Sequence, residues 1–223
     1  MGYRIKKIYV WTQQVRPASW NPWANTVAYY PLTSNANDMV GNYNLSAYAG
    51  ITYSSDWALL PNTTASTWMK EPDGMIDTSL TWTISYWEKP LWASPWWYDG
   101  RWIDLKTTNN RLLSLWSSDS QMFANANFSD TATITETTDV WYNHVITISN
   151  WAVNIYTDWN QTPTLTTSIT WDSYNFRWGQ EFDNSADKQF YWYLKDIIIE
   201  NVVWSTQDIS NYYNLMKWEY GKS

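Results

Sequence analysis

Residues 140–159 read VWYNHVITISNWAVNIYTDW, and this stretch decides the fold class. Ile146 and Ile148 alternate with polar neighbours, and the same alternation recurs over residues 152–157. A period of two is typical of a half-buried β-strand. The Asn150-Trp151 pair between the two runs has the length of a two-residue hairpin loop. The stretch therefore predicts two antiparallel strands joined by a tight turn.

Similar short runs, rich in β-branched and aromatic residues, follow one another along the rest of the chain. The expected strands are 26–30, 43–48, 80–87, 101–106, 111–116, 121–128, 140–149, 152–157, 162–169, 174–179 and 189–200. Many short strands separated by polar turns predict an all-β fold, a two-sheet antiparallel β-sandwich. No repeat of solenoid or propeller length is visible, which argues against those architectures.

One short C-terminal helix completes the expected fold. Ser205 and Asp208 have the spacing of a capping box, with Asp in the usual place of Glu or Gln. Ile209, Tyr212 and Met216 then follow at helical spacing. The 223 residues fit a single sandwich domain over residues 24–223, preceded by an arm or linker over residues 1–23 that carries two prolines.

Charge and composition exclude several classes of function. The net charge of −7 is opposite to what a phosphate backbone attracts, so no nucleic-acid partner is expected. The chain has no cysteine, and therefore neither a disulfide nor a thiolate site. No signal peptide and no apolar run of membrane-spanning length is visible, so membrane insertion is not expected. We nevertheless expect an extracellular, cell-surface or virion location from the kind of domain described below.

The chain has 20 Trp and only 7 Gly, an inversion of ordinary usage, in which glycine averages about 7%. Several Trp stand in turns where glycine is preferred, as in Asn150-Trp151, Asp158-Trp159 and Thr170-Trp171. We infer that many of these positions are glycine in the natural protein. Some uncultivated bacterial lineages translate the codon UGA as glycine, whereas other genetic codes translate it as tryptophan. The alternative is a truly Trp-rich protein with aromatic binding faces. Trp87, Trp141 and Trp204 lie in apolar patterns and are expected to be ordinary core residues.

Four segments together resemble the laminin-G-like domains of the concanavalin A-like lectin/glucanase superfamily. Those segments are Ala28–Asn42, Leu80–Trp87, Val140–Trp159 and Phe190–Ile199. They resemble, in order, the opening strand with its Asp-containing turn, a Phe-Thr-Ile-Ser-x-Trp strand, a Trp-x-His-Val hairpin ending in Asp-Gly, and a Phe-x-Gly-x-Ile-Asp strand. The family has glycine where this chain has Trp159 and Trp192, which agrees with the recoding interpretation.

The resemblance implies a jelly roll that recognises sugars or cell-surface partners. Our first hypothesis is therefore a non-catalytic module that binds a glycan or a cell-surface protein. A second hypothesis is a structural component of a phage-tail-fibre or adhesin type, in which residues 1–23 dock to a larger surface or virion assembly. A third is a glycoside hydrolase of the same fold, and fold alone does not choose among the three.

The hydrolase hypothesis rests on Glu181 and Asp183. Glycosidases of this fold carry a Glu-x-Asp-x-(x)-Glu run, but here the third carboxylate is missing because Ser185 and Ala186 occupy its place. Retaining hydrolysis needs two carboxyl groups about 5–5.5 Å apart. We therefore expect no enzyme and no catalytic residue.

His144, the one histidine, lies in an apolar strand and is expected to be a hydrogen-bonded structural residue rather than a triad member.

No cofactor is expected, although an oxygen-liganded calcium ion is an open alternative. Asn37, Asp38 and Asn42 cluster in one turn, and Asp196 lies in a strand that the family places near the chain start. Asx residues in turns more often bond their own backbone.

An aromatic platform for sugars is suggested by residues 92–102, because flat sugar faces stack on aromatic rings. The candidates are Trp92, Trp96, Trp97, Tyr98 and Trp102. Recoding to glycine would leave Tyr98 and Trp102 as the residues to test, so the sequence assigns no binding residue.

Overall fold

A computed structural model shows the arrangement of the strands. It describes residues 22–47, 50–61, 69–72, 75, 81–92, 100–106, 111–118, 121–126, 130–150, 152–168, 175–178 and 191–222. None of the helices in these ranges has the length and apolar character of a membrane-spanning helix.

The described residues form short helices at either end and strands between them. The elements are α2 (Pro22–Asn25), β1 (Thr26–Tyr30), β2 (Ser46–Ala47), β3 (Thr52–Tyr53), β4 (Ala58–Leu60), β5 (Met69–Lys70), β6 (Thr81–Trp92), β7 (Gly100–Lys106), β8 (Arg111–Ser118), β9 (Gln121–Ala126), β10 (Asp130–Thr135), β11 (Tyr142–Ser149), β12 (Ala152–Thr157), β13 (Leu165–Ser168), β14 (Asn175–Trp178), β15 (Tyr191–Glu200), α3 (Thr206–Met216) and the 3₁₀-helix η1 (Lys217–Tyr220).

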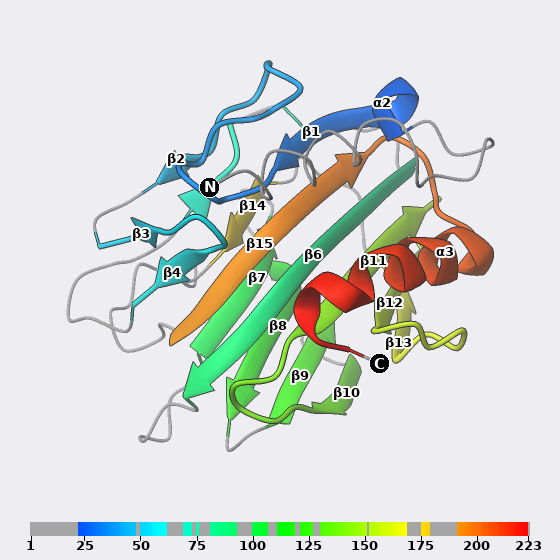
Figure 1. Ribbon diagram of the computed structural model, residues 1–223. Coiled ribbons are helices and arrows are strands. Elements are labelled where there is room, and N and C mark those ends of the chain that lie inside the picture. The colour runs from blue at the N-terminus through cyan, green and yellow to red at the C-terminus, as the bar shows by residue number, and fades with distance from the viewer. Residues whose placement is uncertain are drawn as a thin grey trace.

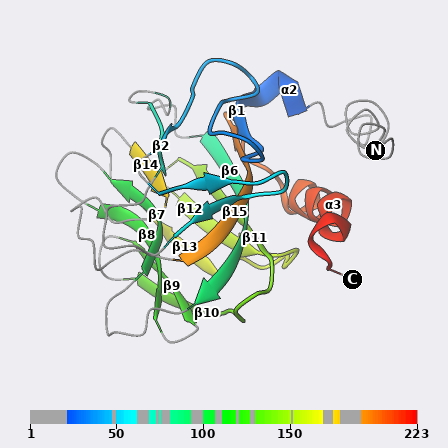
Figure 2. The same ribbon diagram turned by 60° about the vertical axis from the view of Figure 1, so that its left-hand side comes forward.

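These strands build two antiparallel sheets (Figures 1 and 2). The first sheet has the order β13-β12-β11-β6-β15-β4-β3, and β1 pairs with the C-terminal half of β15. The second sheet has the order β10-β9-β8-β7-β14-β5-β2. The expected all-β sandwich with one short C-terminal helix is therefore confirmed. Strands β3, β4, β5 and β10 were not expected from the sequence. The first three are only two or three residues long, whereas β10 was missed although Ala132 and Ile134 alternate with threonines.

The central strand β6 separates two apolar clusters. Trp82, Ile84 and Tyr86 point into the cluster between the sheets, while Trp87 points to the opposite face. There the Trp87 ring stacks on Tyr220, with ring centroids 3.9 Å apart and planes nearly parallel. The period-two alternation of this strand thus buries both of its faces, one under the second sheet and one under the C-terminal segment.

Helix α3 covers the outer face of the first sheet (Figure 1). Ser205 accepts a hydrogen bond from the Asp208 backbone, and the Asp208 carboxylate accepts one from the Ser205 backbone, so the predicted capping box is present. Ile209, Tyr212, Tyr213 and Met216 are the buried residues of the helix, as their spacing predicted.

Strand β15 contains a bulge at Asp196. The register with β6 shifts between Lys195 and Ile198, and Asp196 adopts a left-handed backbone with φ of 50°. A bulge re-aims a side chain out of the strand's alternation. Here it presents the carboxylate to the hydroxyls of Tyr29 and Tyr220, which both donate hydrogen bonds to it.

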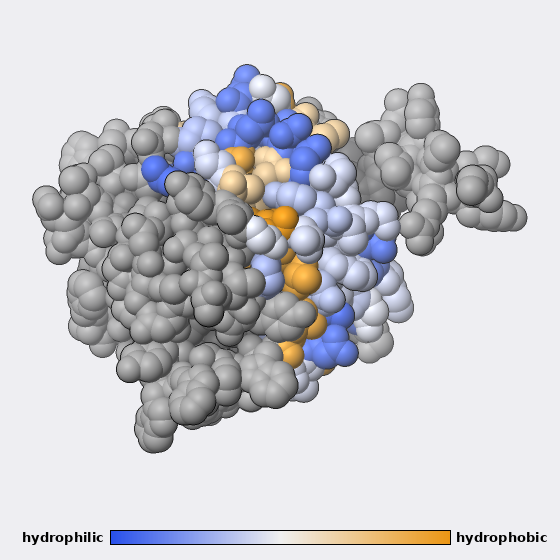
Figure 3. Space-filling view, turned by 90° about the vertical axis from the view of Figure 1, so that its left-hand side faces the viewer, coloured by the Kyte–Doolittle hydropathy of each residue, from blue (hydrophilic) through white to orange (hydrophobic). Residues whose placement is uncertain are grey.

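The domain boundary expected between residues 23 and 24 falls inside α2. Residues 1–21, which carry most of the predicted arm, lie outside the described residues, and the division of the chain stays a prediction. On the side shown in Figure 3, hydrophilic residues cover most of the described surface and the apolar residues gather in a narrow strip.

Candidate functional site

Two of the predicted sites fall where the structure gives no side-chain positions. Glu181 and Asp183, the residues of the hydrolase hypothesis, lie outside the described residues. So do Trp96, Trp97 and Tyr98 of the aromatic platform. Trp92 and Trp102 belong to β6 and β7, but only their backbone is described. The hydrolase hypothesis and the aromatic-platform hypothesis therefore remain predictions.

The Asp38 carboxylate organises a loop through four backbone N–H groups. Its Oδ1 accepts hydrogen bonds from Tyr29 and Val40, each at 2.9 Å. Its Oδ2 accepts from Asn42 and Tyr43, each at 3.1 Å. The two oxygens of a carboxylate offer about four lone-pair positions, and all of them are used here. This arrangement favours the structural role of an Asx turn over calcium ligation at Asp38.

Asp196 has partners of its own and is not joined to Asp38 in one cation site. Tyr29 lies between the two aspartates, since its backbone N–H donates to Asp38 and its hydroxyl donates to Asp196 at 2.7 Å. Burial raises the pKa of Asp196, against the lowering effect of Lys195 and the two tyrosine hydroxyls. In the described part of the chain, these aspartates serve two separate hydrogen-bond networks.

His144 is fully buried in β11, within the strand in which the sequence predicted a hydrogen-bonded structural residue. Its Nε2 lies 3.0 Å from an oxygen of Glu136 and 3.0 Å from an oxygen of Glu88. On the other side of the ring, Nδ1 lies 3.4 Å from the hydroxyl of Thr157. Glu88 and His144 are fully buried and Glu136 is 5% exposed, so the cluster cannot touch a substrate from solution.

Burial and mutual charge shift the pKa values within this cluster. Burial raises the pKa of Glu88 to about 8, and the charge of Glu136 adds to the rise. Burial alone would lower the pKa of His144, but the two neighbouring glutamates raise it to about 10. Neither glutamate was predicted from the sequence, which pointed to the histidine alone. The available signal was the parity of Glu88, which continues the inward-facing series Trp82, Ile84, Tyr86.

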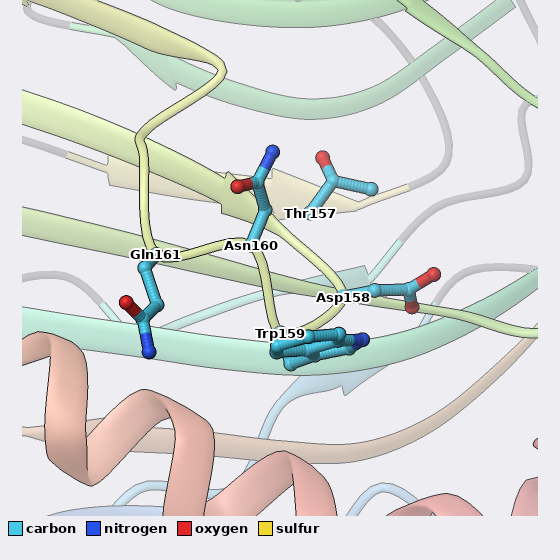
Figure 4. A pocket seen from close by; sticks show the side chains of 5 residues that line it. All are labelled: Thr157, Asp158, Trp159, Asn160 and Gln161. Atoms are coloured by element: carbon cyan, nitrogen blue, oxygen red, sulfur yellow. The ribbon is translucent and has the colours of Figure 1, made fainter. Parts of the chain in front are cut away.

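The turn between β12 and β13 forms the candidate ligand site. Residues 157–161 line a shallow, open hollow of about 450 Å³. Trp159 leaves 55% of its surface exposed there. Figure 4 shows the Trp159 ring on one side of the turn and the side chains of Asn160 and Thr157 on the other. An exposed aromatic ring on a turn that also carries amide groups suits a small polar ligand with an apolar face.

The turn is held in place by Asp158. Its backbone N–H donates to the carbonyl of Asn143 at 2.7 Å, and its Oδ1 accepts from the Asn143 N–H at 3.0 Å. Its Oδ2 lies 3.0 Å from Nζ of Lys222. The carboxylate is thus engaged in anchoring the turn to β11 and to the C-terminal segment. The Trp159 ring, the Asn160 amide nitrogen and the Gln161 side chain are left to face a ligand.

A second aromatic group surrounds Lys89 on the outer face of the first sheet. The Lys89 Nζ lies 5.0 Å from the ring centroid of Tyr193, 5.8 Å from Trp141 and 6.0 Å from Trp57. The same atom is 2.9 Å from a carboxylate oxygen of Asp139. Because the protein's own ammonium group occupies the space between these rings, we do not assign a ligand to them.

The Trp positions suspected of standing for glycine include turn positions and one buried strand position. The residues before Trp151 and Trp159 are left-handed, with φ of 46° at Asn150 and 55° at Asp158. Trp159 itself does not have a positive φ, so the backbone strain expected at that position is not present. Trp192, which the resemblance aligned with a family glycine, is fully buried in the core between the sheets. Recoding stays a prediction, and neither the backbone at Trp159 nor the packing of Trp192 supports it.

Comparison with known proteins shows the fold. No protein-family model matches the chain, and a search of curated protein sequences finds no match either. Solved structures do match. Domain 4 of AbnA, a GH43 extracellular arabinanase from Geobacillus stearothermophilus, solved with arabinotriose, is 16% identical, with a TM-score of 0.64 over 85% of this chain and 98% of that one.

Two larger proteins contain a similar domain. The receptor-binding domain of botulinum neurotoxin C/D mosaic serotype is 13% identical, with a TM-score of 0.65 over 86% of this chain and 51% of its own. Trypanosoma rangeli sialidase is 11% identical, with a TM-score of 0.73 over 90% of this chain and 34% of its own. This chain thus spans about half of the first and a third of the second. At such low identity the similarity establishes the β-sandwich fold and no activity.

Proposed function

We propose that this protein is a non-catalytic recognition module that binds carbohydrate at the β12–β13 turn. The observation that carries the proposal is the exposed Trp159 ring at the hollow formed by residues 157–161, so the proposal takes position 159 as tryptophan and not as recoded glycine. Sugar rings present flat C–H faces that stack on aromatic rings, and hydroxyls that bond to amides. Gln161 and Asn160 supply such amides on the same turn, although the Asn160 side chain points to the opposite side from the ring (Figure 4).

The rigidity of the turn supports the same role. Its ends belong to two strands of one sheet, and Asp158 bonds it to β11 and to Lys222. A preorganised site loses less conformational entropy when a ligand binds. The similar structures add a second kind of support, because they include a domain solved with arabinotriose and a receptor-binding domain.

The absence of catalysis is part of the proposal. The described hollow holds one carboxylate, that of Asp158, and this group anchors the turn. The pair of glutamates at His144 is buried away from solvent. A domain of this kind, whether a laminin-G-like relative or another sandwich lectin, would act outside the cell, at a cell surface or on a virion.

A glycan array tests the proposal. The wild-type chain should bind a defined group of glycans, and Trp159→Ala together with Gln161→Ala should lose most of that signal. Trp218→Ala is the matched control, since Trp218 is also exposed, at 69%, but does not line the hollow. Binding of a protein receptor with no glycan signal would point to the cell-surface alternative and contradict the carbohydrate proposal.

A further inference from the structure

A buried group of two glutamates and one histidine lies beneath the β12–β13 turn and meets it at Thr157, which lies 3.4 Å from Nδ1 of His144. Glu88 comes from β6, His144 from β11, and Glu136 from the segment that joins β10 to β11. One side-chain ligand atom of each lies within 4.8 Å of the other two. Among the described residues, no other set of three such side chains approaches as closely.

The carboxylates of this group are poorly satisfied by hydrogen bonds. Nε2 of His144 lies 3.0 Å from Oε1 of Glu136 and 3.0 Å from Oε1 of Glu88, and a single ring hydrogen can serve only one of these two carboxylates. Both oxygens of Glu88 and Oε2 of Glu136 are buried with no hydrogen-bond donor. The hydroxyl of Tyr86 is buried without a partner as well. Buried polar atoms normally have partners, so four unpartnered oxygens in the neighbourhood of one imidazole call for an additional group.

Charge points to a cation as that group. When both glutamates are ionised, as a bound cation would favour, they carry two negative charges, and His144 supplies at most one positive charge. A divalent cation balances both carboxylates and leaves the imidazole neutral. Thr157 lies 3.4 Å from Nδ1, on the side of the ring away from the glutamates, where a hydroxyl can accept the Nδ1 hydrogen and leave Nε2 free to bind metal.

The distances fit metal coordination. Metal–nitrogen and metal–oxygen bonds of about 2.1 Å, with ligand atoms 3.0 Å apart, subtend about 90° at the metal. That angle is the one between neighbouring positions of an octahedron. We propose that Glu88, Glu136 and His144 form a structural site for a divalent first-row transition-metal ion. Imidazole with carboxylates suits Zn²⁺, Mn²⁺ and Fe²⁺.

The burial of all three ligands implies that the ion enters as the chain folds. The test therefore begins with protein unfolded in urea with a chelator, and then refolded with MnCl₂, with ZnCl₂ or with chelator alone. After gel filtration, bound metal is counted by mass spectrometry. We expect one ion per chain and a higher melting temperature than in the chelated sample.

His144 is the one histidine of the chain, so its imidazole nitrogens can be observed individually by NMR after ¹⁵N-histidine labelling. With Zn²⁺ we expect the Nε2 resonance to shift while Nδ1 keeps its hydrogen. Unchanged resonances in a refolded, zinc-treated sample would overturn the proposal, even if zinc were retained elsewhere on the protein.

Glu88→Gln and Glu136→Gln keep the size of the side chain and remove one charge each. Removing a residue that is hydrogen-bonded to a metal ligand already lowers metal affinity about 10–100-fold. Removing a ligand itself should therefore lower the affinity by more than about tenfold. Glu200→Gln is the control, because Glu200 is equally buried but accepts hydrogen bonds from Thr26 and Trp204. Metal retention that is the same in all three variants, or absent from the wild type, would overturn the proposal.

Discussion

The hydroxyl of Tyr29 donates a 2.7 Å hydrogen bond to Oδ1 of Asp196, across the seam between β1 and β15. Tyr220 donates to the other oxygen of the same carboxylate. Asp196 thereby connects the first strand of the sandwich with the last turn of the C-terminal segment. The bulge in β15 makes this possible, because it turns the side chain of Asp196 toward both tyrosines.

Asp196→Asn should change how stability depends on pH. Burial raises the pKa of Asp196, so the folded chain binds its proton more tightly than the unfolded chain does. Stability contributed by the protonated form is therefore lost as pH rises from the ordinary aspartate value, about 3.9, through the raised folded value. Relative to Asp196→Asn, the wild type should lose about 1.4 kcal/mol for each unit of pKa shift. Urea unfolding between about pH 3.5 and pH 7 measures this difference.

Asn is the suitable replacement because it tolerates the left-handed backbone at position 196. Asp139→Asn is the matched control, since Asp139 is also left-handed but its side chain is 77% exposed. A difference between wild type and Asp196→Asn that stays constant over the whole pH range would contradict the assignment.

Trp159→Gly and Trp192→Gly should have very different effects on folding. Trp192 is fully buried, and removing such a side chain costs about 3–5 kcal/mol even when alanine replaces it. Trp159 is exposed and does not need a left-handed backbone, so its replacement should change stability by less than about 1 kcal/mol. Thermal and urea unfolding of both variants give the comparison. A stable, soluble Trp192→Gly chain would instead favour glycine at that position in the natural protein.

Asp38→Ala should destabilise the loop that follows β1. It removes the acceptor of four backbone N–H groups, and each N–H left buried without a partner costs about 1–3 kcal/mol unless water replaces the carboxylate. Because those donors occupy both oxygens, we expect no change in melting temperature when millimolar calcium replaces chelator. A calcium-dependent rise that disappears in Asp38→Ala would restore the calcium hypothesis.

Ser205→Ala should lower the free energy of unfolding by about 1 kcal/mol, because the first turn of α3 loses its capping side chain. Ser205→Asp, which restores a capping oxygen, should recover most of the loss. Equal stability of the alanine and aspartate variants would show that the capping box contributes nothing measurable.

The elements that could be predicted from the sequence are those marked by a pattern of neighbouring residues. The hairpin of β11 and β12 follows from the alternation of Ile146, Ile148 and Val153 around a two-residue turn. Helix α3 follows from Ser205 and Asp208. The bulge at Asp196 has no local signal, because it depends on the register with β6 and on two tyrosines distant in sequence.

The buried cluster could not be predicted for the same reason. Glu88, Glu136 and His144 come from three segments, and only strand pairing brings His144 opposite Tyr86 and thus beside the inward-facing Glu88. The candidate ligand site was partly anticipated. Asp158-Trp159 was recognised as a turn, but its role in lining a hollow depends on anchoring by Asn143 and Lys222.

Calorimetric titration of the wild-type chain with its strongest array glycan tests the central proposal most directly. We predict one binding site per chain, with affinity reduced at least about tenfold, or about 1.4 kcal/mol, in Trp159→Ala and unchanged in Trp218→Ala. Equal affinity of Trp159→Ala and wild type would contradict the proposal that the β12–β13 turn is the carbohydrate site.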